Sequence, residues 1–179
     1  MKEWIGNIII RFVLNSNSKF KTMFYEELFN HKIKYERSLF VEKYKIAPTF
    51  RFNGIFVNFY GDGEIVCGEN SYIGSYSTVQ ADKNYKVIIG NNCAISHNVR
   101  IYTSSYCTDQ DFNNNINQVK GGNVIIGNGV WIGANVFINP GVIIGDNSVI
   151  GANSVVTKDI AKDTVNGGVP CKFIREKAL

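Results

Sequence analysis

The sequence predicts an all-β solenoid built from six-residue units. Between residues 126 and 161, six consecutive units each begin with Ile or Val, and Gly is the second residue in four of them. The fifth residue is Val, Ser or Ile. A period of six fits neither an α-helix nor an uninterrupted strand, whereas it fits a short strand followed by a sharp corner. Such units bury their apolar side only by stacking, so three of them are expected to close one triangular turn of parallel strands.

The same pattern extends upstream with two breaks. Further units begin with an inward-facing residue at Cys67, Ile73, Val79, Ile89, Ile95 and Ile101. The register changes within residues 82–87, and a polar loop at residues 103–123 separates the two halves of the repeat. Loops of this length in a compact domain are typically functional or disordered. With a partial turn near residues 55–60, we expect roughly four to five stacked turns, whose open ends need a cover.

The chain is expected to divide near residue 54. Residues 1–54 are predicted to form a helical cap and a lead-in strand, with a turn at Asn53-Gly54. Residues 55–179 are predicted to form the coil, including the inserted loop and a C-terminal tail at 162–179. Within the cap, Phe20, Met23, Phe24 and Leu28 indicate an amphipathic helix.

Two interpretations stay open for the apolar run at the N-terminus. Its large apolar residues recur at helical spacing, at Trp4, Ile5, Ile8, Ile9 and Phe12. Residues 1–14 are therefore expected either to pack on one end of the coil or to lie on a membrane surface. The run is too short to span a bilayer, and no small-residue cleavage site of a signal peptide follows it.

Charge and cysteine content exclude some function classes. A net charge of +4 over 179 residues lacks the basic concentration of a nucleic-acid-binding protein. Two of the four cysteines, Cys67 and Cys93, stand at inward-facing positions of the repeat and are expected to be buried. The cysteine spacing indicates neither a metal site nor a disulfide framework, so we expect a cytoplasmic protein.

Four motifs identify a family resemblance: Val130-Trp131-Ile132-Gly133, Ile138-Asn139-Pro140-Gly141-Val142, the run from Ser154 to Ile160, and Gly168-Val169-Pro170-Cys171-Lys172. With them, residues 126–175 resemble the hexapeptide-repeat acyltransferases, and most of all the galactoside, maltose and polysaccharide O-acetyltransferases. The resemblance implies a left-handed parallel β-helix, acetyl-CoA as co-substrate, and a homotrimer that binds CoA in a groove between neighbouring coils.

The resemblance also implies six cofactor contacts: backbone groups of Ala134 and Ala152 for the pantetheine arm, Thr157 and Lys158 beside the head of CoA, and Lys172 and Arg175 for its phosphates. The spacing gives independent support to one pair, because Ala134 and Ala152 are eighteen residues apart and are expected to stack at one corner. An ordinary solvated face is the alternative for the basic residues, since acidic residues stand among them.

The chain departs from the family at two positions. The resemblance places the catalytic histidine in the long loop, at the position of Tyr106. The substrate-binding asparagine of galactoside acetyltransferases is not found within residues 72–78 either. Taken alone, both departures favour a different acceptor or a catalytically silent coil that serves as a scaffold.

His97 is the candidate general base. The unit that begins at Ile95 resembles the Ile-Ala-His motif of the lipid A acyltransferases, in which that histidine is the base. If each side of the triangle continues across the loop, His97 stacks on Ala134 and Ala152. A neutral imidazole is suited to removing the proton of an acceptor hydroxyl, and a backbone N–H to stabilising the oxyanion. The alternatives are a surface histidine at a corner for His97 and, more firmly, a surface histidine for His31 in the cap.

Five further residues are candidate contacts for the acceptor, with a plain solvated loop or a packing role as the alternative for each: Tyr102, Tyr106, Asp109, Asp111 and Trp131. The predicted function is acetylation of a sugar hydroxyl in surface polysaccharide or lipopolysaccharide synthesis. The alternatives are N-acetylation of a nucleotide-linked amino sugar and the silent scaffold. A zinc enzyme, the γ-type carbonic anhydrase of the same coil, is disfavoured because its metal needs three histidines and the coil has one.

Overall fold

The structure is a computed structural model, and it describes residues 10–113 and 118–178. It divides the chain into two units, residues 1–39 and residues 40–179, which are described separately. The apolar positions expected between Trp4 and Ile9 lie outside the described residues.

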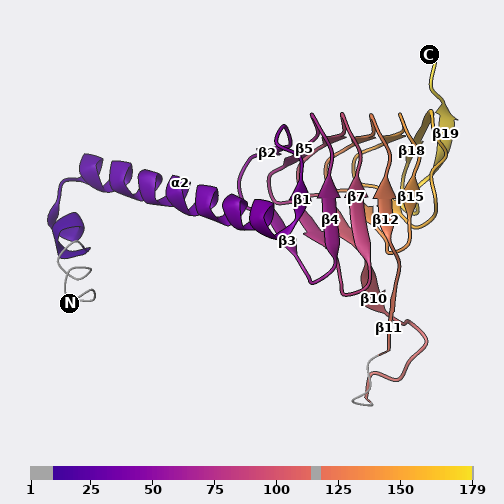
Figure 1. Ribbon diagram of the computed structural model, residues 1–179, viewed down its shortest axis with the longest axis horizontal. Coiled ribbons are helices and arrows are strands. Elements are labelled where there is room, and N and C mark those ends of the chain that lie inside the picture. Colours follow the sequence, from indigo (N-terminus) through magenta and orange to yellow (C-terminus); the bar gives the residue numbers. More distant parts are fainter. Residues whose placement is uncertain (1–9, 114–117, 179) are drawn as a thin grey trace. The chain divides into compact units, whose positions relative to one another are not determined.

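The second unit is a parallel β-helix with three sides (Figure 1). The first sheet contains β1 (Lys45–Ile46), β4 (Glu64–Cys67), β7 (Lys86–Ile89), β12 (Val124–Ile126) and β15 (Ile143–Ile144). The second contains β2 (Arg51–Asn53), β5 (Tyr72–Gly74), β8 (Ala94–Ile95), β13 (Trp131–Ile132), β16 (Val149–Ile150), β18 (Thr164–Gly167) and β19 (Lys172–Glu176). The third contains β3 (Asn58–Tyr60), β6 (Thr78–Gln80), β9 (Arg100–Tyr102), β14 (Phe137–Ile138) and β17 (Val155–Val156). The first and third sheets have five strands each, so the expected number of turns is confirmed.

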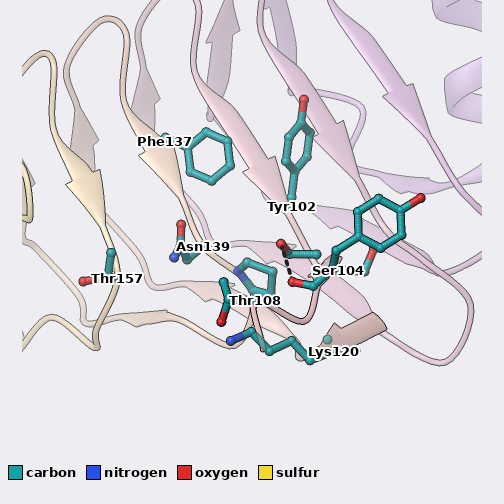
Figure 2. Close-up of a pocket in the computed structure, with 11 residues that line it drawn as sticks. Tyr102, Ser104, Thr108, Lys120, Phe137, Asn139 and Thr157 are labelled. Atoms are coloured by element: carbon teal, nitrogen blue, oxygen red, sulfur yellow. Dashed lines mark hydrogen bonds between the residues drawn. The ribbon is translucent and has the colours of Figure 1, made fainter. Parts of the chain in front are cut away.

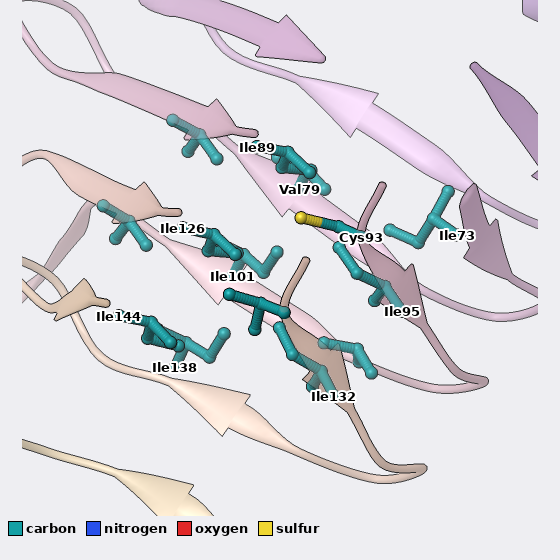
Figure 3. Packing of buried hydrophobic residues seen from close by; sticks show 14 of the residues in the cluster. Ile73, Val79, Ile89, Cys93, Ile95, Ile101, Ile126, Ile132, Ile138 and Ile144 are labelled. Carbon is teal, nitrogen blue, oxygen red and sulfur yellow. The ribbon is translucent and has the colours of Figure 1, made fainter. Parts of the chain in front are cut away.

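The first residues of the repeat units form the core, as expected (Figure 3). Four isoleucines stack through consecutive turns of the second sheet, and all are 0% exposed: Ile73, Ile95, Ile132 and Ile150. The fifth residues of the units also point inward, and Cys93 occupies such a position. Burial of Cys67 and Cys93 confirms the expectation for these two thiols. The apolar period of six therefore specifies the whole column through close packing of β-branched side chains.

The last unit of the repeat does not keep the predicted register. Ile160 is expected at a fifth position, yet it forms a parallel bridge with Ile144, and its N–H donates to the carbonyl of Ile143 at 2.9 Å. Ile160 thus takes the first position of the next unit in the first sheet. The corner after Val156 is shorter than the others, and no glycine in the sequence marks that change.

The turn expected at Asn53-Gly54 is a corner of the coil. The strands on its two sides, β2 and β3, belong to the second and third sheets and pair with β5 and β6. Coil strands already begin at Lys45, and aromatic side chains cover this first turn. The ring of Phe59 lies 5.5 Å from that of Phe40 and 6.5 Å from that of Tyr44. The opposite end is covered by the antiparallel pair β18 and β19.

A long helix, α2 (Ser18–Lys43), precedes the coil. The expectation of an amphipathic helix is wrong, because its apolar side chains point in all directions around the axis and none of its 26 residues is buried. The part of α2 before Phe40 belongs to the first unit, so a capping role for these residues stays a prediction. Among the described residues, no helix is long and apolar enough to cross a membrane.

The inserted loop begins and ends as a two-stranded ribbon. β10 (Ser104–Tyr106) pairs antiparallel with β11 (Val119–Gly121), and the ribbon projects from the coil (Figure 1). Tyr106 lies opposite Val119 in this ribbon, and the ring of Phe112 packs edge-on at 6.1 Å from the ring of Tyr106. The ends of the loop are therefore ordered by backbone pairing, which the polar composition of the loop does not indicate.

Candidate active site

Two neighbouring pockets flank the base of this ribbon on the third side of the coil. The Thr157 pocket has a volume of about 380 Å³, and Figure 2 shows the side chains around it. It is lined by Tyr102, Ser104, Ser105, Tyr106, Thr108, Lys120, Gly121, Phe137, Asn139, Pro140 and Thr157. The Asp82 pocket has a volume of about 510 Å³ and is lined by Tyr60, Gln80, Asp82, Tyr102, Ser104, Ser105, Tyr106 and Val119. The first part of the ribbon thus forms a wall common to both.

The repeat explains how these residues come together. Tyr60, Gln80, Tyr102, Asn139 and Thr157 each follow the inward-facing residue of a strand in the third sheet, and the strand register places them in one outward-facing column. Successive side chains of a strand point to opposite faces, so an outward column runs beside every inward ladder. The coil therefore presents aromatic, amide and hydroxyl groups along one line.

Gln80 fixes the root of the ribbon. Its side-chain amide nitrogen donates to the hydroxyl of Ser104 at 2.8 Å, and its amide oxygen accepts from the backbone N–H of Thr103 at 3.0 Å. The buried hydroxyl oxygen of Thr103 accepts from the N–H of Asp82 at 2.8 Å. The ring of Tyr102 packs edge-on against Phe137 at 5.3 Å. These contacts hold the wall between the two pockets in place.

The two pockets differ in chemistry. Among the described residues that line the Thr157 pocket, none carries an imidazole or a carboxylate, and Lys120 supplies a positive charge. The Asp82 pocket contains the Asp82 carboxylate. Burial raises the pKa of the Tyr60 phenol above its ordinary value, and the neighbouring Tyr102 and Asp82 add to the shift. Tyr60 therefore enters the Asp82 pocket as a neutral hydroxyl.

His97 lies at a different place, on the corner that joins the second sheet to the third. We call this the second corner. Ile95 pairs with Ile132, which pairs with Ile150, so His97, Ala134 and Ala152 occupy equivalent positions in consecutive turns. The predicted stacking is confirmed. The backbone N–H of Asn135 donates to the carbonyl of His97 at 3.0 Å, and the His97 side chain is exposed.

The imidazole of His97 accepts a hydrogen bond. The backbone N–H of Ser75 donates to Nδ1 at 3.0 Å. The ring lies over Gly74, where a Cβ atom would stand only 2.8 Å from Nδ1, so a glycine is needed there. A neutral imidazole has one acceptor nitrogen. In this arrangement that nitrogen is Nδ1, and Nε2 carries the proton.

Amide side chains form a ladder beside this imidazole. The Asn98 side chain donates to Asn135 at 2.8 Å, and that of Asn135 donates to Asn153 at 3.0 Å. Nη1 of Arg100 donates to the side-chain oxygen of Asn98 at 2.7 Å. The guanidinium of Arg100 is thereby held at the same corner as His97.

The structure separates the predicted site residues into several places. It brings Tyr102, Tyr106 and Thr157 together in one pocket. His97, Ala134 and Ala152 share the second corner, whereas Lys158 is exposed after β17 and Lys172 and Arg175 are exposed on β19. Trp131 lies on the outer face of β13 in the second sheet, away from the return of the loop into β12 of the first sheet.

Asp109 and Asp111 belong to the inserted loop and do not line either pocket. The Asp111 carboxylate accepts from the backbone N–H of Asn113 at 2.9 Å and from its side-chain amide at 2.8 Å, and these bonds hold the pKa of Asp111 below its ordinary value. This carboxylate therefore stabilises a local turn of the loop.

Several residues that line the pockets are not among the site residues predicted from the sequence, namely Gln80, Asp82, Ser104, Lys120, Phe137 and Asn139. A signal was present for Gln80 and Asn139, because both occupy the same position of their units as Tyr102 and Thr157. Lys120 had no such signal, since its position depends on the pairing of β10 with β11. In the part of the chain that the structure describes, no group of three His, Cys, Asp or Glu side chains is placed to hold a metal ion.

Comparisons with known proteins agree with this architecture. The family model for the bacterial transferase hexapeptide, with six repeats, matches residues 123–158. No curated protein matches the chain. Among solved structures, a galactoside acetyltransferase in complex with coenzyme A is 35% identical, with a TM-score of 0.61, and the match covers 84% of this chain and 82% of that one.

Two further structures are similar to the chain. A hexapeptide-repeat-containing acetyltransferase from Vibrio cholerae O1 biovar eltor, complexed with acetyl-coenzyme A, is 27% identical with a TM-score of 0.63, over 80% of this chain and 76% of that one. The N-acyltransferase AntD from Bacillus cereus, in complex with dTDP and coenzyme A, is 23% identical with a TM-score of 0.62, over 76% and 80%. The last likeness concerns the fold alone.

Proposed function

Because the chain belongs to the hexapeptide-repeat acetyltransferases, we propose that it transfers the acetyl group of acetyl-CoA to a hydroxyl of a sugar used in surface polysaccharide or lipopolysaccharide synthesis. The observation that carries this proposal is the identity of 35% with a galactoside acetyltransferase over most of both chains. The coil is left-handed and parallel, as in that family. The paired pockets on its third side offer hydroxyl, amide and aromatic groups suited to polar substrates.

Acetyl-CoA is the proposed donor. The galactoside acetyltransferase structure contains coenzyme A, and the Vibrio cholerae structure contains acetyl-coenzyme A. In this chain, Ala134 and Ala152 offer backbone groups at the second corner, and Thr157 and Lys158 follow β17. Lys172 and Arg175 on the exposed β19 supply positive charge for the phosphates. Direct transfer needs no acyl-enzyme, because the acceptor oxygen attacks the thioester carbonyl, the C–S bond breaks, and the CoA sulfur leaves.

His97 is the proposed general base that takes the proton of the acceptor hydroxyl and returns it to the leaving sulfur. Base action by Nε2 requires the tautomer with its proton on Nδ1, and in that tautomer the bond from the Ser75 N–H is given up. Loss of one such hydrogen bond costs about 1 kcal/mol, which is small beside the usual contribution of a general base.

We further propose that the active enzyme is a homotrimer in the cytoplasm. Within one chain, His97 lies at the second corner, before the strand β9, whereas Tyr102 and Thr157 lie in the pocket at the far ends of the strands of the third sheet. A site that uses both sets of residues therefore needs two copies of the chain. All four cysteines are free, in keeping with a reducing compartment.

N-acetylation of a nucleotide-linked amino sugar remains the second candidate. The Asp82 carboxylate supports it, because a protonated amino group is attracted to a carboxylate in a pocket. A catalytically silent coil is the third candidate, since Tyr106 stands at the position of the family's loop histidine.

The test is release of free CoA from acetyl-CoA with a panel of neutral sugars, amino sugars and sugar nucleotides. The proposal predicts release that depends on a neutral sugar. Release only with amino sugars would favour the second candidate, and none with any member would favour the silent coil. Tyr102→Ala tests the Thr157 pocket in the same assay; if this variant is inactive, mixing it with His97→Ala chains before assembly should restore part of the activity when the site joins two copies.

A further inference from the structure

The second corner contains two residues that its backbone disfavours. One residue of each turn there has a positive φ: Phe56 (55°), Tyr76 (62°), Asn98 (54°), Asn135 (60°) and Asn153 (59°). Asparagine adopts this left-handed conformation readily, whereas bulky residues seldom do. The last three turns follow this preference. The first two place an aromatic residue there instead.

These aromatic rings lie outside the hydrophobic core. Phe56 is 52% exposed and Tyr76 is 55% exposed, so neither ring fills the core. The two rings stack on each other, with centroids 5.4 Å apart and an angle of 28° between their planes. Disfavoured backbone conformations persist at functional sites more often than elsewhere. An exposed, flat aromatic surface with a disfavoured backbone therefore indicates a binding role.

This aromatic pair is the neighbour of His97. Ser75, which donates to Nδ1 of His97, directly precedes Tyr76, and the backbone N–H of Asn98 donates to the carbonyl of Ser75 at 2.8 Å. Along the corner, consecutive turns thus present Phe56, Tyr76, His97, Ala134 and Ala152. The imidazole stands between the aromatic pair and the two alanines proposed for CoA.

That order matches what direct acetyl transfer requires. A base must reach the acceptor hydroxyl on one side and face the thioester on the other. With the donor on the alanine side, the acceptor belongs on the aromatic side. The guanidinium of Arg100, held through Asn98, and the hydroxyl of Ser75, which accepts from the N–H of Ile55, supply polar groups at the same corner.

We propose that Phe56 and Tyr76 form a stacking platform for the sugar ring of the acceptor, and that this platform decides which saccharides are acetylated. The proposal rests on the proposed function and names the acceptor site within it. One face of a pyranose carries C–H groups that pack on an aromatic ring, while its hydroxyls point to the rim. Arg100 is suited to donate to those hydroxyls or to an acidic group on the sugar.

The test uses variants that suit the backbone. Asparagine fits this positive-φ position of the corner, as Asn98 shows, so Phe56→Asn and Tyr76→Asn should keep the fold. Tyr76→Phe is the matched control because it keeps the ring. Saturation-transfer NMR with the methyl glycosides of glucose, galactose and glucosamine reports binding through the ring C–H protons without any turnover.

The expected result is saturation transfer to at least one glycoside in the parent and in Tyr76→Phe, and its loss in both asparagine variants. Where the same glycoside is acetylated, its KM should rise roughly tenfold in the asparagine variants, with an unchanged KM for acetyl-CoA. Equal saturation transfer to the glycoside from the parent and from all variants, or no saturation transfer from the parent, would overturn the proposal. A changed oligomeric state in the asparagine variants would also overturn it, since the rings would then join two copies. Binding without acetylation would instead count against the proposed function alone.

Discussion

The backbone N–H of Ser75 donates to Nδ1 of His97 at 3.0 Å, and this bond determines the tautomer and the orientation of the imidazole. It places the proton on Nε2 and orients the ring toward the turn that contains Tyr76. The base proposed from the sequence is therefore held in a tautomer that must change before it accepts a proton at Nε2. The hydrogen bond from the neighbouring turn thus positions the ring, since the partner of one imidazole nitrogen sets the protonation of the other.

The first prediction concerns His97→Ala. Turnover should fall by roughly 10²–10⁴-fold, the usual contribution of a general base, while the melting temperature and CoA affinity stay unchanged because the side chain is exposed. Steady-state kinetics with calorimetric CoA binding measure this. His97→Gln is the control: a glutamine donates a hydrogen bond but accepts no proton at neutral pH, so substantial activity in it would mean that His97 acts as a donor.

The second prediction concerns the core ladder. Ile132→Asp should lower the free energy of unfolding by several kcal/mol, roughly the cost of an unpaired buried charge, since Ile132 is 0% exposed between two turns. Ile143→Asp on the outer face of the first sheet, where the parent side chain is 46% exposed, is the matched control. Chemical denaturation that shows equal loss in both variants would contradict the register.

The third prediction concerns the cofactor. Lys158→Ala and Arg175→Ala should raise the KM for acetyl-CoA more than they lower kcat, because contacts with the remote head of CoA are alike in the ground and transition states. Lys162→Ala, an exposed lysine for which no cofactor contact is proposed, should change neither constant. A selective fall in kcat in the first two variants would remove them from the cofactor site.

The fourth prediction concerns thiol reactivity. Burial raises the pKa of the Cys67 thiol far above its ordinary value, and it also raises the pKa of the Cys93 thiol. Both thiols therefore stay protonated in the folded protein. Iodoacetamide at neutral pH should therefore spare them and modify the partly exposed Cys107 and Cys171. Peptide mass spectrometry reads this out, and denatured protein, in which all four react, is the control. Fast labelling of Cys67 under native conditions would contradict its place in the core.

The sequence predicts the coil well and the site only in part, for a physical reason. Inward positions repeat with a strict period because they must pack, so Ile95, Ile132 and Ile150 are legible in the pattern. The predicted position of Ile160 in the repeat is wrong because the corner before it is shorter, which changes the spacing but not the residue types. The pocket depends on outward positions and on the pairing of β10 with β11, where packing imposes no periodic signal.

The N-terminal helix illustrates the same limit. Phe24 and Leu28 lie at helical spacing, which predicts a helix, and α2 confirms it. The neighbouring Met23 and Tyr25 are equally apolar and exposed, so no single face emerges. Local spacing therefore predicts the helix, but it does not predict which surface, if any, the apolar side chains of the helix contact.

The most direct measurement of the central claim is the chemical identity of the product. Parent enzyme, acetyl-CoA and the best neutral sugar from the panel should give an acetylated sugar by mass spectrometry, together with an equal amount of free CoA. Treatment with hydroxylamine should remove the acetyl group, as it does from an ester, and His97→Ala should form the product far more slowly. A product that resists hydroxylamine, or CoA release without any acetylated sugar, would contradict sugar O-acetylation.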